Sequence, residues 1–419
     1  MKTYATLVLG CKVNDYEAAY IEQEMNRDYQ KVSFKERADA YIIFSCAVTN
    51  IAEAKTRKFI RQARRLNPDA FITVVGCYVQ ADPKATVFEE ADLLIGTKGK
   101  KDIKRMIDEN IRSHEVEELD GLTFEDMPLE DYGRKDRAFL KIQDGCNQFC
   151  AFCIIPYARG RERSAKHEDV IEQAKRFAES TSEIVLTGIH TGRYYDGEYH
   201  LLDLLKELVK IGKLQTIRLS SIEITEIPDA MIDFMANEPK IAPHLHIPLQ
   251  AGSDHTLSEM HRPYTTSFFK EKVDYIRSKI PHISVSTDLI VGFPGESDED
   301  FAETLAFLDE IDFSFIHLFP YARKRGTAAD KRNDFVDGNI VKQRIHQVNE
   351  LEAKKTESYH KSLLGLDTRI FVEKSVKGFS YGYSREYVYT KAEGTYPIGT
   401  SLPVRFTGLT EEGMEGQPL

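Results

Sequence analysis

The chain has 419 residues, of which 42% are hydrophobic and 29% charged, a composition typical of two or three folded domains. No stretch reaches the roughly 18–20 apolar residues that cross a bilayer, and the opening MKTYATLVLGCK lacks the basic start and cleavage site of a secretory signal. We therefore expect no membrane contact and a cytoplasmic location. The net charge of −11 argues against DNA binding or a polyanion site beyond a local basic patch.

Residues 1–114 are predicted to form an α/β domain with a parallel sheet. Three short apolar runs end at Cys11, Cys46 and Cys77, and a helical segment follows each cysteine. A fourth strand is expected near residue 91. Because parallel sheets bind ligands beyond the carboxyl ends of their strands, these cysteines, the scattered trio, are predicted to converge at one edge. The alternative is three small buried strand-end residues.

The helical segment after Cys46 has a basic face opposite an apolar stripe of Phe59, Ala63 and Leu66. This face is either an RNA-binding surface or an ordinary solvated helix surface. Its basic residues are Lys55, Arg57, Lys58, Arg61, Arg64 and Arg65.

Residues 115–136 are predicted to be an exposed acidic linker, since positions 115–131 hold eight Asp or Glu and no Lys or Arg. Strands then alternate with helices over residues 137–360. Six such units predict a partial (βα)6 barrel with its site at the carboxyl ends of the strands. The expected strands are 138–143, 183–188, 216–221, 244–249, 284–292 and 313–321. The expected helices include 166–180, 200–211, 266–280, 297–311 (capped by Ser297 and Asp300) and 339–364.

Residues 361–419 are predicted to form a small all-β barrel from the strand-like runs TRIFVEKS, YSREYVYTKA and SLPVRFTGL. Seven Lys or Arg are balanced there by seven Asp or Glu, so this part is not a strongly basic RNA binder. Its tyrosines suit either base stacking or strand packing. They are Tyr381, Tyr383, Tyr387 and Tyr389.

Cys146, Cys150 and Cys153, the tight trio, lie in DGCNQFCAFCIIPYARGR after the first barrel strand. A structural zinc site uses four ligands, and the nearest histidines are His167 and His190. A non-catalytic, zinc-stabilised RNA-binding protein is the alternative of another class. On a [4Fe–4S] cluster, three cysteines leave one iron open to a small molecule.

The spacing CNQFCAFC resembles the Cx3Cx2C signature of the radical S-adenosylmethionine (SAM) superfamily. The motifs LGCKVNDYEA, FSCAVTNIAEAKTRK, VVGCYVQ, LHIPLQAGSDHTLSEMHRPYT and TDLIVGFPGESDEDF extend the resemblance to the methylthiotransferases. The resemblance implies that the tight trio holds a [4Fe–4S] cluster whose open iron binds SAM. It implies that the scattered trio holds a second [4Fe–4S] cluster, and that the C-terminal barrel is a TRAM-like RNA-binding domain.

The resemblance also implies a set of SAM contacts at the ends of the barrel strands. Gly188 and Gly292 fit plain strand-end turns equally well, and Arg159, with its neighbours Arg161 and Arg163, is a candidate for a phosphate or the SAM carboxylate. The full set is Gly188, Ser221, Glu223, Gln250, Ser253, Gly292 and Arg159.

Members of this family add a methylthio group to a tRNA adenosine beside the anticodon or to a ribosomal-protein aspartate, with SAM as methyl donor and radical source. The GCKVN form of the first motif resembles the subgroup acting on threonylcarbamoyladenosine. The isopentenyladenosine subgroup more often shows GCQMN and the ribosomal-protein subgroup GCPKN. The implied partners are the tRNA anticodon stem-loop and a reductase or flavodoxin-type electron donor.

Overall fold

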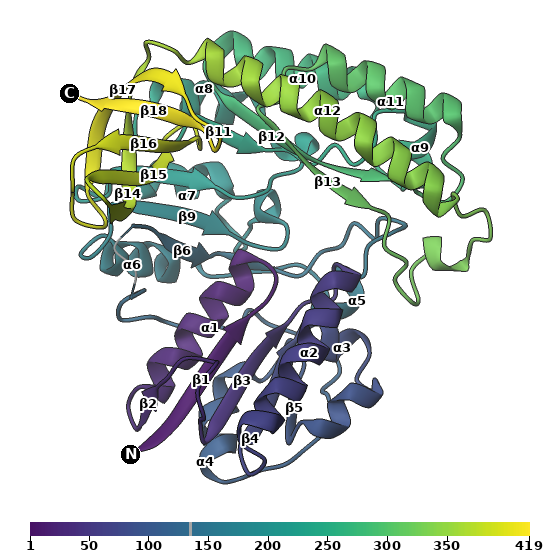
Figure 1. The fold of residues 1–419 in the computed structure, drawn as a ribbon, viewed down its shortest axis with the longest axis vertical. Helices are drawn as coiled ribbons and strands as arrows, with labels where there is room; N and C mark the ends of the chain where they lie inside the picture. The colour runs from purple at the N-terminus through teal and green to yellow at the C-terminus, as the bar shows by residue number, and fades with distance from the viewer. Residues whose placement is uncertain (134–135) are drawn as a thin grey trace.

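The computed structural model describes residues 1–133 and 136–419; residues 134 and 135, at the end of the predicted linker, lie outside the described residues. Three parts follow one another along the chain (Figure 1). An α/β layer comes first, then an open arc of parallel strands covered by helices, and then a small β-barrel on the flank of the arc.

The N-terminal part contains a five-stranded parallel sheet with the order β2-β1-β3-β4-β5. Every residue of β3 and β4 is buried, as expected for central strands covered on both faces. The predicted strands before the three cysteines and near residue 91 are therefore confirmed. The strands are β1 (Lys2–Val8), β2 (Tyr29–Lys31), β3 (Ala40–Ser45), β4 (Phe71–Gly76) and β5 (Leu93–Ile95).

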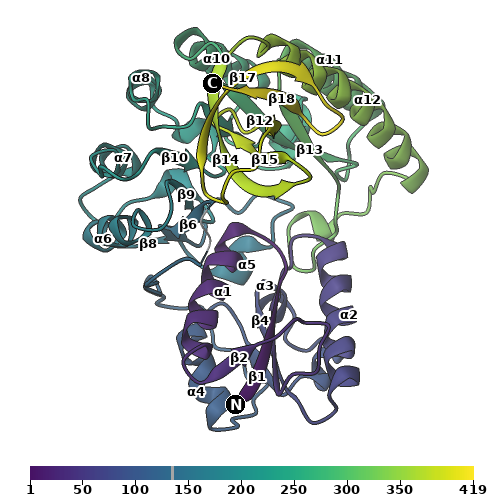
Figure 2. The ribbon, with the colours of Figure 1, turned by 60° about the vertical axis from the view of Figure 1, so that its left-hand side comes forward.

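Two long helices cover opposite faces of this sheet (Figure 2). Ile21 of α1 packs against Ile42, whereas Ile60 of α2 packs against Ile43 on the other face. Thr49 is the N-cap of α2, since its hydroxyl accepts a hydrogen bond from the Ala52 amide. The helices are α1 (Lys12–Met25), α2 (Asn50–Leu66), α3 (Cys77–Ala81) and α4 (Ile103–Asp108), with 3-10 turns η1 (Thr86–Glu90) and η2 (Lys100–Asp102).

The central part has the six predicted parallel strands. Two three-stranded ladders, β6-β9-β10 and β11-β12-β13, are joined into one arc by the bridges Ile217–Ile241 and Ser221–His246. The tight trio lies in the segment between β7 (Gln143–Asp144) and β8 (Arg163–Ser164), which pair as a short antiparallel ribbon. The arc strands are β6 (Ala138–Lys141), β9 (Glu183–Thr187), β10 (Thr216–Leu219), β11 (His244–His246), β12 (Ser284–Val291) and β13 (Phe315–Pro320).

The predicted helices of the arc are also present, and Ser297 and Asp300 form the predicted reciprocal cap of α11. No helix among the described residues combines the length and apolar character required to cross a bilayer. The helices are α5 (Ile155–Arg159), α6 (His167–Phe177), α7 (Leu201–Leu208), α8 (Asp229–Asn237), α9 (Asp254–Glu259), α10 (Thr266–Lys279), α11 (Asp298–Glu310) and α12 (Gly338–Ser362), with 3-10 turns η3 (Thr191–Arg193), η4 (Ile224–Glu226) and η5 (Ala329–Lys331).

The acidic linker is anchored at its far end, so the prediction of an exposed segment is wrong there. Met127 and Leu129 are buried in the core of the arc. The Tyr16 hydroxyl of α1 donates to the Met127 carbonyl at 2.8 Å, and the Gln173 amide of α6 bonds to both backbone groups of Leu129. Apolar residues between the acidic ones allow this stretch to fasten α1 to α6.

The C-terminal part is a closed five-stranded barrel with the order β14-β15-β16-β18-β17. The run YSREYVYTKA does not form one strand: β15 ends at Ser384, and a turn with Tyr387 at φ 63° leads into β16. No glycine marks this turn, which is why the sequence hid it. The strands are β14 (Asp367–Val376), β15 (Phe379–Ser384), β16 (Tyr389–Glu393), β17 (Ser401–Leu409) and β18 (Met414–Pro418), the last of which was not expected.

Candidate functional site

The scattered trio converges at the carboxyl edge of the N-terminal sheet, as predicted. Cys11 precedes α1, Cys46 follows β3 directly, and Cys77 is the first residue of α3 after β4. Gly10 permits this close approach. Its φ is +109°, and a Cβ at this position would lie 2.9 Å from Cβ and 3.1 Å from Sγ of Cys46.

The thiols of the scattered trio influence one another. Burial raises the pKa of Cys46 to about 12, and Cys77 and Cys11 add to that rise. Three thiolates so close together repel one another unless a metal group shares their charge. A hollow of about 330 Å³ lies beside Cys11 and Cys46. The residues therefore fit a metal cluster with three protein ligands.

The tight trio lies on a loop held to the barrel at defined points. The Cys153 amide donates to the Cys150 carbonyl at 3.0 Å. Ala151 hydrogen-bonds through its backbone to Met260 and Ala329, at 3.0 and 2.8 Å. Backbone hydrogen bonds with Met260 and Ala329 thus fix this loop against the rest of the arc.

The spacing of the thiols argues against zinc in either trio. Among the described residues, Cys146, Glu162 and His190 are the metal-binding side chains whose ligand atoms all lie within 4.8 Å of one another. Neither cysteine trio meets that spacing, whereas the sulfur ligands of one tetrahedral zinc ion lie about 3.8 Å apart. The wider arrangement suits a cluster of several irons.

His190 contacts the tight trio and two carboxylates. Its Nδ1 lies 3.4 Å from Cys146 Sγ and from Glu162, and its Nε2 lies 2.9 Å from a carboxylate oxygen of Glu226. Burial opposes the imidazolium, but hydrogen bonds to Cys146, Glu162 and Glu226 outweigh it and raise the His190 pKa to about 12. A protonated imidazole donates from both nitrogens, so His190 can donate to Cys146 and Glu226 together.

Arg262 is a functional residue that the sequence did not single out. Its Nη1 donates to Cys150 Sγ at 3.2 Å, and its other arm pairs with Glu223. Nε donates to the Tyr264 hydroxyl at 3.1 Å, which fixes the guanidinium. Donors to ligating thiolates orient them and adjust the redox potential of a cluster. The basic residue within HRPYT was the available signal.

Four of the predicted SAM contacts lie beyond the carboxyl ends of successive strands. Gly188 follows β9, Ser221 follows β10, Gln250 lies beyond β11 and Gly292 follows β12. Packing alone also explains Gly292, since its φ is +78° and a Cβ there would lie 2.5 Å from a methyl group of Val341 in α12. Gln250 has φ 69°, an uncommon conformation for a residue with a side chain.

Ser253 and Arg159 are engaged by other protein groups. The buried Ser253 hydroxyl donates to Asp300 at 2.6 Å and caps α9. Arg159 is fully buried, and its guanidinium donates to groups that include Cys77 of the scattered trio. The SAM contact predicted for each is therefore less well supported than that of the residues on the open strand ends.

A hollow of about 190 Å³ lies between the two trios. Its lining combines Val48 and Thr49, from the loop after Cys46, with Cys153 and its neighbours and with Gln250. Val48 and Thr49 also line the hollow beside Cys11 and Cys46. Cys153 of the tight trio and Cys11 and Cys46 of the scattered trio therefore lie at adjoining spaces. The same space is lined by Asp288 within β12 and by Tyr321 and Lys324 after β13, none of which the sequence singled out.

The basic face of α2 is partly structural. The Arg64 guanidinium donates to the Pro68, Ala70 and Glu90 carbonyls and pairs with Asp92 at 2.9 Å. Lys55, Lys58, Arg61 and Arg65 are exposed beside it, with Arg61 also 3.4 Å from Glu90, and Arg57 donates to the Tyr78 hydroxyl. Arg64 thus holds α2 to the domain, whereas the exposed residues of this face remain open to solvent.

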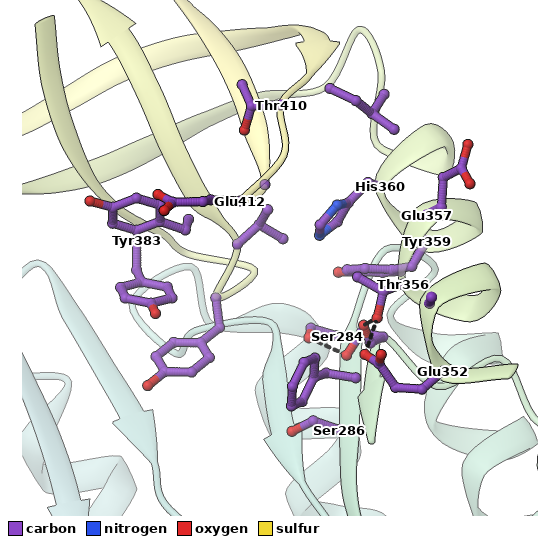
Figure 3. Close-up of a pocket in the computed structure, with 18 of the residues that line it drawn as sticks. Ser284, Ser286, Glu352, Thr356, Glu357, Tyr359, His360, Tyr383, Thr410 and Glu412 are labelled. Atoms are coloured by element: carbon purple, nitrogen blue, oxygen red, sulfur yellow. Dashed lines mark hydrogen bonds between the residues drawn. The ribbon is translucent and has the colours of Figure 1, made fainter. Parts of the chain in front are cut away.

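A pocket between the arc and the C-terminal barrel lies at the amino ends of the arc strands, away from the cysteines (Figure 3). It measures about 570 Å³ and begins at His244, Ser284 and Phe315, the first residues of β11, β12 and β13. It is lined by Glu352, Glu357, Glu411 and Glu412 and, within the described part of the chain, by no Lys or Arg. These carboxylates would repel RNA phosphates, so Tyr383, Tyr387 and Tyr389, which share the lining, do not form an RNA site within it.

Comparison with protein families and curated proteins agrees with this geometry. The "Radical SAM superfamily" model matches residues 140–308, and "Uncharacterized protein family UPF0004" matches residues 3–96. "Threonylcarbamoyladenosine tRNA methylthiotransferase MtaB" of Bacillus subtilis is 38% identical over 100% of this chain and 96% of its own. The protein of the same name from Aquifex aeolicus is 36% identical over 94% and 98%. "tRNA-2-methylthio-N(6)-dimethylallyladenosine synthase" of Carboxydothermus hydrogenoformans is 34% identical over 84% and 83%.

Solved structures share the fold at low identity. The radical SAM methyltransferase TsrM of Kitasatospora setae, with cobalamin and a [4Fe–4S] cluster bound, aligns with TM-score 0.56 and 15% identity over 76% of this chain and 75% of its own. The cobalamin-dependent radical SAM enzyme OxsB, with aqua-cobalamin and SAM bound, aligns with TM-score 0.53 and 12% identity over 85% and 56%.

Proposed function

The chain belongs to the radical SAM tRNA methylthiotransferase family, and we propose that it converts N6-threonylcarbamoyladenosine beside the anticodon into its 2-methylthio derivative. The observation that carries this proposal is the position of the two cysteine trios. Cys153 lines one hollow, Cys11 and Cys46 line another, and the two hollows share Val48 and Thr49, which supports one substrate position served by both trios. Replacing an unreactive C–H bond with a C–S bond requires radical formation and sulfur supply side by side.

The proposed cofactors are SAM and two [4Fe–4S] clusters, held by Cys146, Cys150 and Cys153 and by Cys11, Cys46 and Cys77. When bound, they supply the deoxyadenosyl radical, the sulfur and the methyl group. The polypeptide contributes position and charge. Arg262 and His190 donate to two thiolates of the tight trio, and Gly188, Ser221, Glu223, Gln250 and Gly292 are the proposed SAM contacts.

The subgroup assignment rests on the GCKVN motif and on the relatives. The Bacillus subtilis and Aquifex aeolicus relatives, named for threonylcarbamoyladenosine, are 38% and 36% identical to this chain, against 34% for the Carboxydothermus hydrogenoformans relative named for dimethylallyladenosine. The relatives thereby also support a tRNA anticodon stem-loop as substrate. A cytoplasmic location and a reductase or flavodoxin-type electron donor complete the proposal.

Nucleoside analysis tests the substrate directly. Deleting the gene should remove 2-methylthio-threonylcarbamoyladenosine from total tRNA and leave its unthiolated precursor, as measured by mass spectrometry. The wild-type gene should restore it, and a Cys150→Ala copy should not. Loss of the methylthio group from the isopentenyl or dimethylallyl nucleoside instead would overturn the subgroup assignment. An unchanged nucleoside profile would overturn tRNA as the substrate.

We predict that the exposed basic residues of α2 bind tRNA. The triple variant Lys58→Gln, Arg61→Gln, Arg65→Gln should weaken binding in a filter or fluorescence assay. Its affinity should also depend less on salt. The slope of log affinity against log salt concentration should become shallower by about 0.7–0.9 for each phosphate that the variant no longer neutralises. The control Lys206→Gln, Lys210→Gln, Lys213→Gln neutralises three exposed lysines in and beyond α7. Equal behaviour of the two triples would show that α2 is merely solvated.

A further inference from the structure

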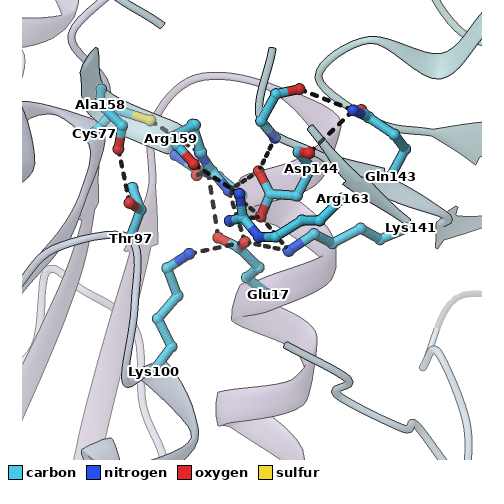
Figure 4. Close-up of polar contacts among 12 residues, drawn as sticks. Glu17, Cys77, Thr97, Lys100, Lys141, Gln143, Asp144, Ala158, Arg159 and Arg163 are labelled. Carbon is cyan, nitrogen blue, oxygen red and sulfur yellow. Dashed lines mark hydrogen bonds and ion pairs between the residues drawn. The ribbon is translucent and has the colours of Figure 1, made fainter. Parts of the chain in front are cut away.

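A group of buried charges joins the N-terminal part to the arc (Figure 4). From the N-terminal part it takes Glu17 of α1 and Lys100 of η2, whose ion pair measures 2.8 Å. From the arc it takes Lys141 at the end of β6, Asp144 of β7 and Arg159 at the end of α5. Arg163 of β8 completes this seam cluster through a 3.0 Å pair with Asp144.

Arg159 is the member of the seam cluster that reaches the scattered trio. Its Nε donates to Cys77 Sγ at 3.2 Å, Nη1 to Glu17 at 2.8 Å and Nη2 to Asn14 at 2.7 Å. Nη1 also lies 3.4 Å from Asp144. One side chain thus contacts a cysteine after β4, two residues of α1 and the strand that leads into the tight trio.

The charges of the seam cluster do not balance. Four cations, Lys100, Lys141, Arg159 and Arg163, meet two carboxylates, Glu17 and Asp144, and all six are buried or nearly so. Burial lowers the pKa of Lys100. Even with Lys100 neutral, one positive charge remains in excess. An uncompensated buried charge is costly, so an anion belongs next to this cluster.

Cys77 occupies the position where that anion is needed. Its Sγ accepts a hydrogen bond from Arg159 Nε at 3.2 Å, so it directly contacts one of the excess cations. Thiolates bound to iron keep negative charge on sulfur whatever the pH of the solution. A cluster on the scattered trio would supply the missing anion, and the cations would stabilise its reduced form, which carries one more negative charge.

We infer that Arg159 is a positioning residue that links occupancy of the scattered trio to the docking of the N-terminal part on the arc. This inference rests on the proposed second cluster. Cluster binding neutralises the seam, which tightens the contact between the two parts, and the Nε–H···S bond raises the reduction potential of the cluster. Cys153, the last cysteine of the tight trio, lies six residues before Arg159. The same contact therefore fixes the position of the tight trio relative to the sulfur-supplying site.

The reduction potential tests the contact. In a Cys150→Ala background, in which the scattered trio holds the remaining cluster, Arg159→Gln should shift the midpoint potential to more negative values. It should also speed iron loss to a chelator by about 10–100-fold. Arg163→Gln is the matched control, because it removes a buried arginine paired with the same Asp144 but hydrogen-bonded otherwise to backbone carbonyls. Equal potentials and iron loss in Arg159→Gln and Arg163→Gln would overturn the inference.

The contact of Arg262 with the tight trio provides a second control. In a Cys77→Ala background, Arg262→Gln should shift the potential of the tight-trio cluster, whereas Arg159→Gln should leave it in place. If Arg159→Gln does not fold, Arg159→Lys replaces it. Lysine keeps the charge but loses the planar fork, so a smaller shift in the same direction is expected, and no shift would overturn the inference.

Hydrogen exchange of the protein without substitutions measures the docking. Reconstitution with iron and sulfide should slow amide exchange in α1 and in 141–145, on both sides of the seam, and Arg159→Gln should abolish this slowing. Equal slowing in both proteins would overturn the inference. Iron content separates this from the proposed function: one cluster's worth of iron in the reconstituted wild type would refute the second cluster itself. Two clusters' worth without the Arg159 effects would refute only the role of Arg159.

Discussion

Cys150→Ala should abolish 5′-deoxyadenosine formation and, with it, all methylthiolation of tRNA. Alanine offers no ligand in place of the thiolate, and Cys150 is the thiol to which Arg262 donates. The expected loss is complete within detection. It is measured after anaerobic reconstitution by iron analysis and by chromatography of deoxyadenosine and the modified nucleoside.

Cys77→Ala is the matched comparison, because Cys77 belongs to the other trio and to another part of the chain. It should keep about half the iron and still cleave SAM reductively, yet insert no sulfur. Sulfur insertion at the wild-type rate would make the scattered trio structural. Loss of all iron and all SAM cleavage in a folded Cys77→Ala protein would show that the two sites are not independent.

Glu17→Gln should destabilise the protein by about 3–5 kcal/mol, because it removes one of two carboxylates facing four buried cations. Glu17 is fully buried and contacts Lys100, Lys141 and Arg159 at 2.8 Å each. The free energy of unfolding in denaturant measures the loss. Glu24→Gln on the same helix is the control: it breaks a surface pair with Arg27, which should cost at most about 1 kcal/mol.

The pH dependence of stability gives a second measurement on Glu17→Gln. Burial raises the pKa of Glu17, but Arg159, Lys100 and Lys141 outweigh it and hold the pKa below its usual range. A carboxyl with a lowered folded-state pKa stabilises fully above its unfolded pKa of about 4.3 and loses that contribution as the pH falls. Glu17→Gln should therefore show a shallower loss of stability below about pH 4 than the wild type. Parallel acid profiles would contradict the proposed balance of charges.

Local patterns were sufficient for the strands and for the cysteine edges. The runs before Cys46 and Cys77 are buried over their full length, as central parallel strands require, and the run before Cys11 is mostly apolar. Strand direction alone then brings the three ends to one edge. The six arc strands followed from the same alternation of strand and helix. The turn at Tyr387 was missed because no glycine marks it, and the burial of Met127 and Leu129 was missed because it depends on neighbours distant in sequence.

The partners of the charged side chains were decided by the tertiary structure. Arg159 follows the cysteine motif closely, which suggested a SAM contact, but packing of α5 against α1 and α3 turns it toward Glu17 and Cys77. Arg64 looked like part of an RNA surface and instead holds the turn before β4. A sequence shows that a residue is charged and where it lies along an element. Which opposite charge it meets depends on how separate elements pack, because long side chains reach across those contacts.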